Sequence, residues 1–466
     1  MGKAVLSRLD FMRLAVATAA GAMLSACQPE VAQETAEVEE AAGEPVEVPP
    51  VEEAITLRHL TRGGTYLDDV AQRQIDVFTA EHPNITIELD KTPTGDLLDK
   101  LLLQVAAGNA PDSWFGDPRS GGLAWHKNML VDLDPYLDSE PTYNEEDFIE
   151  NAWVGAEFGG KIHGLAWDSG ALMVQFNIDM FEEAGVDVPE PDTPLTWSQL
   201  IDIGTQLTLD FDDRHPDSTE FDPSRVKQYG FGFRDRFFFP FLWTNLAEFI
   251  ESDGSMPIDT PEAIEAMQFA ADIGAKHFIG PSPGYQQSME ISLVMKTLAM
   301  HYNGVWMLGR LNEAELNWGA IPFPVSKVPA SYGHYSPLML TRDSKHIDEA
   351  FKFIYWACCS KEGQGILLET GMLQPTRRDL IDEFVNSADP PARKYRQAFV
   401  DAFDPASFRY PGDTMGSFAG GFLGLIVDDT ILPAMDPVWR GDVAYEEIAS
   451  DLREKCEYAL EHGELM

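Results

Sequence analysis

The chain of 466 residues contains few cysteines. The four present are Cys27, Cys358, Cys359 and Cys456, too few for a disulfide framework, and none has the Cys/His spacing of a zinc site. Cys358 and Cys359 fall in an apolar helical run over 350–359, which predicts buried thiols. We therefore expect no metal site and no cofactor.

Positive charge is also scarce. Lys and Arg total 33 against 77 Asp and Glu, which gives a net charge of −44. Such a chain repels phosphates, and this argues against nucleic acid as a partner. The same charge disfavours a polyanionic ligand unless a local basic pocket is hidden in the acidic surface.

Sequence motifs of catalysis are missing as well. The chain has no Gly-x-Ser-x-Gly elbow, no His-Glu-x-x-His and no P-loop. With 77 acidic residues, chance carboxylate pairs are many, so their number carries no information about glycoside hydrolysis. The sequence therefore favours a binding protein over an enzyme, and an extracytoplasmic hydrolase is the less favoured alternative.

The N-terminus has the features of an export signal. Lys3, Arg8 and Arg13 precede an apolar run over 14–26 that is too short to span a bilayer. The run ends at Cys27 in Leu-Ser-Ala-Cys, which resembles a bacterial lipoprotein signal and predicts a signal peptide over 1–27 with lipid on Cys27. The alternative is an ordinary signal peptide with an incidental cysteine. The stretch 7–12 resembles a twin-arginine signal that lacks its second arginine, so the export route stays open.

An acidic linker follows the signal. Residues 28–54 contain nine Glu, no Lys or Arg, and four Pro. Such a segment buries too little apolar surface to fold, and like charges keep it extended. We expect a body that is extracytoplasmic and anchored to the cell membrane by the lipid, at the cell surface or in the periplasm.

The body begins with an alternating α/β pattern. Strands are predicted over 55–60, 85–89 and 113–117, with helices over 66–81 and 96–107 between them. Ligands in such folds bind beyond the carboxyl ends of the strands. The pattern therefore places Arg62 and the stretch 114–117 on one common rim.

Two later stretches are predicted to cross between lobes. The first is 160–168, where glycines flank a short strand that ends in Trp167 and Asp168; the second is 334–340. Taken alone, the first stretch is better explained as a strand with a buried Trp and an exposed Asp. Further strands are predicted over 229–233, 297–303 and 318–324, and further helices over 178–185, 196–201, 237–249, 261–275, 347–359 and 443–460, while 121–137 is predicted to form a helix and a turn.

The order of these segments resembles the extracytoplasmic solute-binding proteins of ABC importers, and most closely family 1, which includes maltose and other sugar binders. The resemblance covers about 55–460, and its markers, in chain order, are the segments 78–85, 106–112, 160–168, 177–185, 196–197, 299–306 and 440–442. It implies an α/β fold of two α/β lobes joined by crossing hinge strands, the periplasmic-binding-protein-like type II fold. The implied N-terminal lobe is 55–163 with 338–392, the C-terminal lobe is 168–333 with 393–466, and the hinge crossings are 164–167 and 334–337.

The resemblance also implies a ligand cleft between the lobes. Aromatic rings would pack on sugar faces, and polar side chains would bind hydroxyls. The side chains of these types at the resembling positions are Trp114, Asp117, Trp167, Asp168, Trp243, Tyr302, Asn303, Trp306, His334 and Tyr335. Trp197 and Trp439 are better explained by helix packing. The family often has an aromatic residue near the end of its first strand, where this chain has Arg62, and this leaves the identity of the ligand open.

The implied function is capture of a sugar or oligosaccharide and its delivery to the membrane permease of an ABC importer, by a protein expected to be monomeric. Two alternatives remain at this point. One is another small polar solute, such as a glycerol-phosphate derivative, and the other is a lipoprotein that senses its ligand for a membrane receptor.

Overall fold

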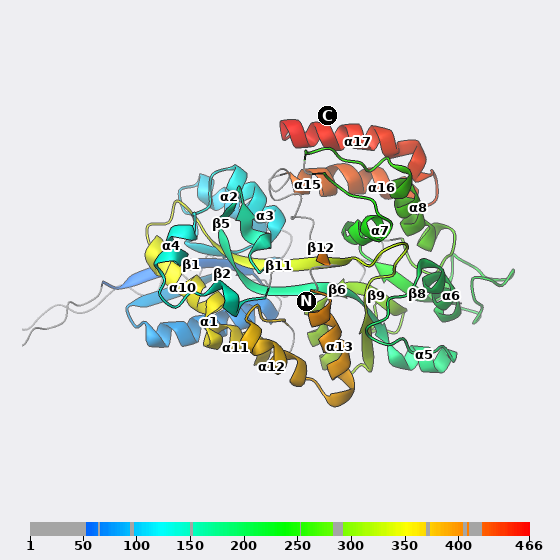
Figure 1. Cartoon of the computed structure of the whole chain (residues 1–466), viewed down its shortest axis with the longest axis horizontal. Helices are drawn as coiled ribbons and strands as arrows, with labels where there is room; N and C mark the ends of the chain where they lie inside the picture. The colour runs from blue at the N-terminus through cyan, green and yellow to red at the C-terminus, as the bar shows by residue number, and fades with distance from the viewer. Residues whose placement is uncertain are drawn as a thin grey trace, which may run out of the picture. The chain divides into compact units, whose positions relative to one another are not determined.

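The computed structural model in Figure 1 describes residues 53–63, 66–93, 97–149, 152–251, 253–282, 292–369, 373–403, 408–409 and 422–466. The predicted signal peptide, Cys27 and almost all of the predicted acidic linker lie outside these residues. Within the described part of the chain, no helix is long and apolar enough to cross a membrane.

The first lobe is built on three parallel strands. β1 (Ile55–Arg62) pairs with β2 (Ile85–Thr92) on one side and with β3 (Ser113–Phe115) on the other. The helices α1 (Tyr66–Glu81) and α2 (Leu97–Ala106) connect them. Apolar residues alternate with polar ones in β2, so one face of that strand is buried and the other is exposed. The predicted β-α-β-α-β order is confirmed.

The second lobe has its own parallel pair. β8 (Val226–Phe233) runs parallel to β9 (Leu298–Gly304), so their carboxyl ends lie at the same edge of the sheet. β7 (Leu209–Asp210) extends the sheet beside β8. β10 (Trp318–Ile321) pairs in antiparallel fashion with the C-terminal half of β6 (Gly164–Asn177).

The strands β6 and β11 (Ser331–Leu340) connect the two lobes. They lie side by side and antiparallel along the middle of Figure 1. The N-terminal half of β6 pairs with β11, including the part of β11 that also pairs with β3. The C-terminal half of β6 pairs with β9. The register shifts between Ser336, opposite Asp168, and Pro337, opposite Ala166, which leaves Trp167 as the extra residue of a β-bulge.

The start of this crossing differs from the prediction in one detail. Gly159 and Gly160 have φ values of +61° and +72° and form the turn between β4 (Glu157–Phe158) and β5 (Lys161–Ile162). The continuous strand begins only at Gly164. A Cβ atom there would lie 2.9 Å from Cγ of Met339, so glycine permits the close approach of β6 and β11.

The buried side chains form two large cores. The first core runs from Leu57 to Trp167 and resumes from Leu338 to Leu373, whereas the second core takes most of 171–330 and 380–459. Leu380 and Phe384 pack in the second core, although we predicted that the first lobe extends to 392. We now propose that the chain passes back to the second lobe between 373 and 380.

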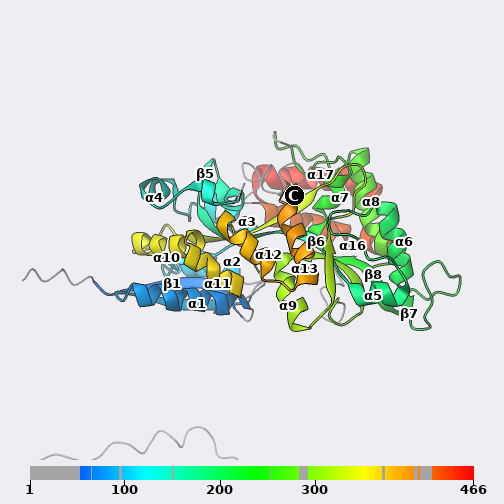
Figure 2. The ribbon, with the colours of Figure 1, turned by 60° about the horizontal axis from the view of Figure 1, so that its bottom comes forward.

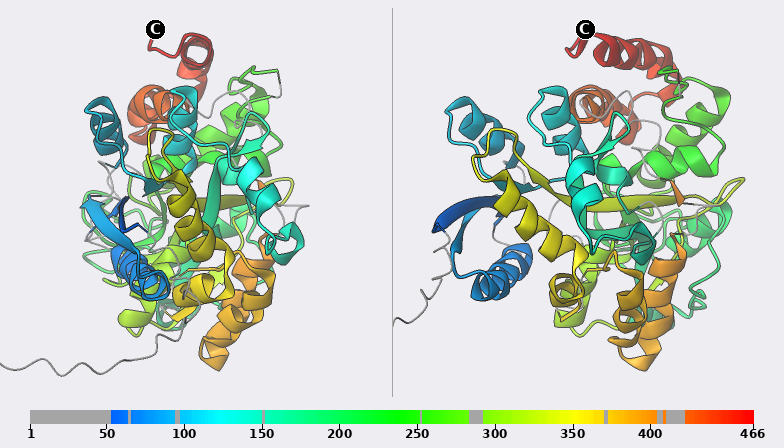
Figure 3. Two further views of the ribbon diagram at one scale, coloured as in Figure 1. Left: turned by 90° about the vertical axis from the view of Figure 1, so that its left-hand side faces the viewer. Right: turned by 60° about the vertical axis from the view of Figure 1, so that its left-hand side comes forward.

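The strands of both lobes belong to one continuous sheet, and helices cover it in each lobe. Figure 2 shows α10 and α11 beside α1, a contact that closes one face of the first lobe. Figure 3 shows the C-terminal helix α17 next to α16, and α17 also packs against α8 in the second lobe. The bounds of the remaining helices are α3 Pro118–His126, α4 Asp134–Ser139, α5 Ile178–Ala184, α6 Trp197–Leu207, α7 Phe239–Thr244, α8 Pro261–Ala275, α9 Leu308–Glu313, α10 Ile347–Cys359, α11 Lys361–Glu369, α12 Ile381–Asn386, α13 Pro390–Asp401, α15 Leu423–Ile426, α16 Leu432–Trp439 and α17 Tyr445–His462.

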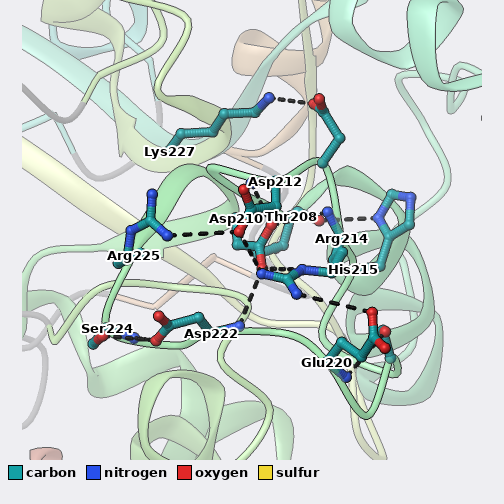
Figure 4. Close-up of polar contacts among 12 residues, drawn as sticks. Thr208, Asp210, Asp212, Arg214, His215, Glu220, Asp222, Ser224, Arg225 and Lys227 are labelled. Carbon is teal, nitrogen blue, oxygen red and sulfur yellow. Dashed lines mark hydrogen bonds and ion pairs between the residues drawn. The ribbon is translucent and has the colours of Figure 1, made fainter.

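A polar loop between β7 and β8 is organised around one carboxylate. The buried Asp210 accepts backbone N–H groups of Asp212, Arg214 and Asp222, and the Arg214 side chain donates to it over 2.8 Å (Figure 4). Burial opposes ionisation, but these donors lower the pKa of Asp210 to about 2. Every partner of Asp210 is supplied by the loop itself, so the cluster is structural.

Candidate functional site

A cavity of about 720 Å³ lies between the two lobes. First-lobe residues on its wall include Arg62, Asp117 and Arg119, and second-lobe residues include Leu425 and Asp428. The wall includes both charged and apolar side chains, as expected of a site for a polar ligand with apolar faces.

Asp117 is held in place by the start of α3. Its Oδ1 accepts the backbone N–H of Ser120 at 2.8 Å in a capping box, while Arg62 donates to its Oδ2 at 2.8 Å. Burial opposes ionisation, but Arg119, Arg62 and the Ser120 N–H together lower the pKa of Asp117 well below its ordinary value. The predicted common rim of Arg62 and Asp117 is confirmed.

Asp428 supplies the matching carboxylate of the second lobe. It lies in one π-helical segment, Val427–Ile431, between α15 and α16. Such irregular turns are frequent at functional sites. Arg236 of the same lobe donates to Asp428 at 2.8 Å, and Arg119 of the first lobe also donates to it. Asp428 therefore links the two lobes.

A second cluster lies on the crossing strands. Asp168 is buried, with 1% of its surface exposed, and its Oδ1 lies 3.6 Å from Nε2 of His334 on the neighbouring strand. Nε2 of His334 also lies 3.0 Å from the Ser336 hydroxyl. The ring of Trp306 contacts His334 with centroids 4.5 Å apart. Trp306 packs against both cores and therefore lies at the boundary between the lobes.

Aromatic side chains join this cluster to the arginines of the cavity. The Phe237 ring contacts both Trp306, with centroids 6.3 Å apart, and Tyr332, with centroids 5.8 Å apart. Burial raises the pKa of Tyr332 to about 12, although Arg119 and Arg236 act in the opposite direction. The crossing-strand cluster and the cavity wall are thus neighbouring parts of one interlobe region.

Four of the predicted site residues lie in this region. They are Asp117, Asp168, Trp306 and His334. Asp168 is buried rather than exposed, contrary to the simpler interpretation of its strand.

The other predicted site residues have enclosed side chains, as Asp168 does. Those with at most 6% of their surface exposed are Trp114, Trp167, Trp243, Tyr302, Asn303 and Tyr335. Trp167 donates its indole N–H to Gln74 at 2.6 Å in the first core, and Asn303 accepts the backbone N–H of Gly304 at 2.9 Å. These two contacts favour packing roles for Trp167 and Asn303, and a role of the six side chains in ligand binding stays a prediction. The predictions that Trp197 and Trp439 serve packing are confirmed: Trp197 stacks on Phe269, and Trp439 is buried in the second core.

Sequence reasoning missed five residues of the region: Arg119, Arg234, Arg236, Tyr332 and Asp428. A signal existed for two of them. Arg234 and Arg236 directly follow the strand predicted over 229–233, and the carboxyl-end argument that placed Arg62 on a rim applies there equally. Asp428 lies in a helical stretch where no sequence pattern marks the π turn.

Within the described ranges, no group of three or more His, Cys, Asp or Glu side chains could hold a metal ion. The described cysteines, Cys358, Cys359 and Cys456, are free and buried, as predicted for the first two.

Comparison with known proteins is consistent with this architecture. The model of a family described as bacterial extracellular solute-binding protein matches residues 73–394. The maltotriose-binding protein of Pyrococcus abyssi is 22% identical over 77% of this chain and 73% of its own length. A putative binding protein of Brucella abortus is 24% identical over 70% of this chain and 76% of its own length.

Solved structures share the fold. An ABC substrate-binding protein from Listeria monocytogenes, in complex with cycloalternan, superposes with a TM-score of 0.75 at 19% identity, covering 87% of this chain and 99% of that one. The GacH receptor of Streptomyces glaucescens, solved without ligand and with acarbose, gives a TM-score of 0.69 at 20% identity over 87% and 98%. The predicted type II binding-protein fold is confirmed, and so is the prediction of a binding protein rather than an enzyme. With a family match over more than half of its length, the chain belongs to the bacterial extracellular solute-binding protein family, whose members act outside the cytoplasm.

Proposed function

We propose that this protein captures a sugar or oligosaccharide between its two lobes and delivers it to the membrane permease of an ABC importer. The observation that carries the proposal is the interlobe region, where both lobes line a cavity of about 720 Å³ and the half-buried Trp306 packs against both cores. Sugars present apolar C–H faces and a girdle of hydroxyls, which match an aromatic ring beside ionised hydrogen-bonding groups. Relatives named for maltotriose and arabinooligosaccharide binding support this class of ligand.

The crossing strands would act as the hinge. Among the described strands, β6 and β11 are the pair that passes from one lobe into the other, and the bulge at Trp167 interrupts their register at the crossing. Closure about such strands traps a ligand in the cleft. We place the bending points in 164–167 and 334–337.

We further propose that lipid on Cys27 anchors the protein to the membrane and that residues 28–54 act as its tether. The support is the sequence pattern described above. Replacement of Cys27 by Ser should release the protein from the membrane fraction into the extracytoplasmic soluble fraction. Continued membrane attachment of that variant would refute the anchor and leave ligand capture untouched.

Ligand capture is tested with the purified protein in a thermal-shift screen of mono- and oligosaccharides, neutral and acidic. Binding to the folded state raises the melting temperature by mass action. We expect at least one carbohydrate to give a concentration-dependent rise and to be recovered chemically unchanged. Conversion of the sugar to products, or no response to any carbohydrate in the screen, would refute the proposal.

A further inference from the structure

One arginine of the interlobe region differs from the other three. Arg234 directly follows the carboxyl end of β8, and its guanidinium lies 5.6 Å from the centroid of the Phe237 ring. Arg62, Arg119 and Arg236 each form an ion pair with Asp117 or Asp428. Among the described residues, no carboxylate lies within ion-pair distance of Arg234 and its side chain has no hydrogen bond.

The neighbourhood of Arg234 carries excess positive charge. Among the described residues, Asp117 and Asp428 are the two carboxylates that form ion pairs with Arg62, Arg119 and Arg236, and neither pairs with Arg234. The adjacent Asp235 acts on Arg234 only at longer range, and its Oδ1 accepts the backbone N–H of Arg236 at 2.9 Å. Asp99 and Asp429 also line the cavity, but neither forms an ion pair with these arginines in the described structure. The excess is therefore local to Arg234.

The surroundings of Arg234 disfavour the charged form of its guanidinium. Arg234 is partly buried, and burial together with the nearby Arg236 lowers its pKa. Its charge also reaches His301 on the neighbouring strand, where burial and Arg234 together lower the pKa to about 3. A desolvated cation among like charges is costly unless an anion arrives to pair with it.

Arg234 is also close to the aromatic part of the region. The Phe237 ring contacts both the Arg234 guanidinium and the ring of Trp306. A sugar ring on Trp306 would therefore have a vacant guanidinium one side chain away. The planar guanidinium matches a carboxylate in bidentate geometry.

We propose that the sugar bound by this protein is acidic and that Arg234 binds its carboxylate. This inference rests on the proposed capture of a sugar and assigns its chemical class. A singly charged uronate suits the site better than a phosphate of about two charges, because the chain carries a net charge of −44 and repulsion grows with ligand charge. At physiological salt, screening limits the repulsion from the chain's net charge to a range of about 8 Å. The attraction within one local ion pair can therefore exceed that repulsion.

The test compares each acidic monosaccharide with its own neutral form. The probes are galacturonate, glucuronate, mannuronate and guluronate, their methyl esters, maltotriose, and glucose 6-phosphate, titrated calorimetrically into the purified protein. We expect one uronate to bind at least about tenfold more tightly than its ester. In Arg234→Gln this preference should disappear while the affinity for the ester changes less than about twofold, and Arg234→Lys should recover it only in part.

Arg225→Gln is the matched control. Arg225 precedes β8, at the opposite end of the strand that Arg234 follows, and its side chain is 55% exposed. The Arg225→Gln substitution removes the same single charge as Arg234→Gln. A loss of the preference for the uronate over its ester in both variants would therefore indicate long-range electrostatics and refute a role for Arg234.

The outcomes separate this inference from the proposed function. Tighter binding of maltotriose or of an ester than of every uronate refutes the acidic ligand and keeps sugar capture. Binding of glucose 6-phosphate without any uronate refutes the carboxylate. Equal weakening of acid and ester in Arg234→Gln assigns Arg234 a structural role, and failure of every carbohydrate refutes sugar capture itself.

Discussion

At the scale of single residues, packing partners separate the proposed ligand contact Trp306 from a core residue of the same chemistry. Trp306 packs against both cores, whereas Trp197, which is also partly exposed, stacks on Phe269 at a ring distance of 4.0 Å within the second lobe. Both are tryptophans near the second core, so they form a natural pair for separating binding from stability.

Replacement of Trp306 by Ala should weaken sugar binding by at least about tenfold, because a stacked aromatic ring contributes on the order of 1–2 kcal/mol to such contacts. Trp197→Ala should lower the free energy of unfolding by about 2–4 kcal/mol and leave affinity within about twofold. Calorimetric titration and urea denaturation measure the two effects. Unchanged affinity in Trp306→Ala would assign that ring to the core.

The opposite result is expected for Trp167. Its indole N–H donates to Gln74 at 2.6 Å, and 2% of its surface is exposed. Trp167→Phe keeps most of the ring but removes the donor, so the free energy of unfolding should fall by about 1–3 kcal/mol with no change in sugar affinity. Urea denaturation and calorimetry of one preparation test this. A loss of affinity with unchanged stability would return Trp167 to the ligand contacts.

At the scale of elements, the strands and their order along the chain were predictable. The burial of individual side chains was not. The alternation in 85–89 and the turn after α2 follow from local sequence, and β2 and α2 lie there. The face to which Trp114 or Tyr302 points depends on which strands flank β3 and β9. That pairing joins residues more than a hundred positions apart, as between β6 and β9. Local periodicity carries no information about such partners.

Helix bounds failed where polar turns interrupt an apolar pattern. The stretch 121–137, predicted as a helix and a turn, contains the end of α3 and the start of a second helix, α4, and the helix predicted over 237–249 is the short α7. Asp117 caps α3 and Pro118 follows it, a start signal that lay upstream of the predicted bound. The residues at such interruptions, Asp117 and Arg236 among them, are the ones that reach the interlobe region.

The loop around Asp210 gives a prediction of pH dependence. Its folded pKa of about 2 lies below that of an unfolded aspartate, so its contribution to stability is present above about pH 4 and is lost as pH falls toward 2. Asp210→Asn should therefore be less stable than the wild type near pH 7, and the gap should narrow below about pH 4. Denaturant unfolding at several pH values measures this difference in the free energy of unfolding.

Asp213→Asn is the control for this loop. It removes the same charge, but the Asp213 side chain is 75% exposed where it pairs with Lys227. Exposed pairs contribute about 0–1 kcal/mol, so little change is expected at any pH. A gap between wild type and Asp210→Asn that stays constant down to about pH 3 would contradict the role given to the carboxylate.

At the scale of the whole molecule, Asp428 belongs to the candidate site and also forms an ion pair between the two lobes that the hinge joins. The described structure joins the lobes covalently through chain crossings and electrostatically through Arg119 and Asp428. The side chains of this pair are 35% and 25% exposed, so its strength is that of a partly screened ion pair. A contact of this strength biases an equilibrium between open and closed lobes without fixing it.

Asp428→Asn should accordingly shift the ligand-free protein toward the open state by about two- to fivefold, the equivalent of about 0.5–1 kcal/mol. The shift can be measured as the distance between labels at two exposed positions, Leu103→Cys in α2 and Leu246→Cys beyond α7, in a Cys27→Ser background, since the described cysteines are buried. Asp436→Asn, which breaks the exposed pair with Arg440 on α16, should leave the distance unchanged. High salt should move the wild type toward Asp428→Asn because it screens the pair. An identical distance distribution in wild type and Asp428→Asn would mean that the crossing strands alone set the lobe equilibrium.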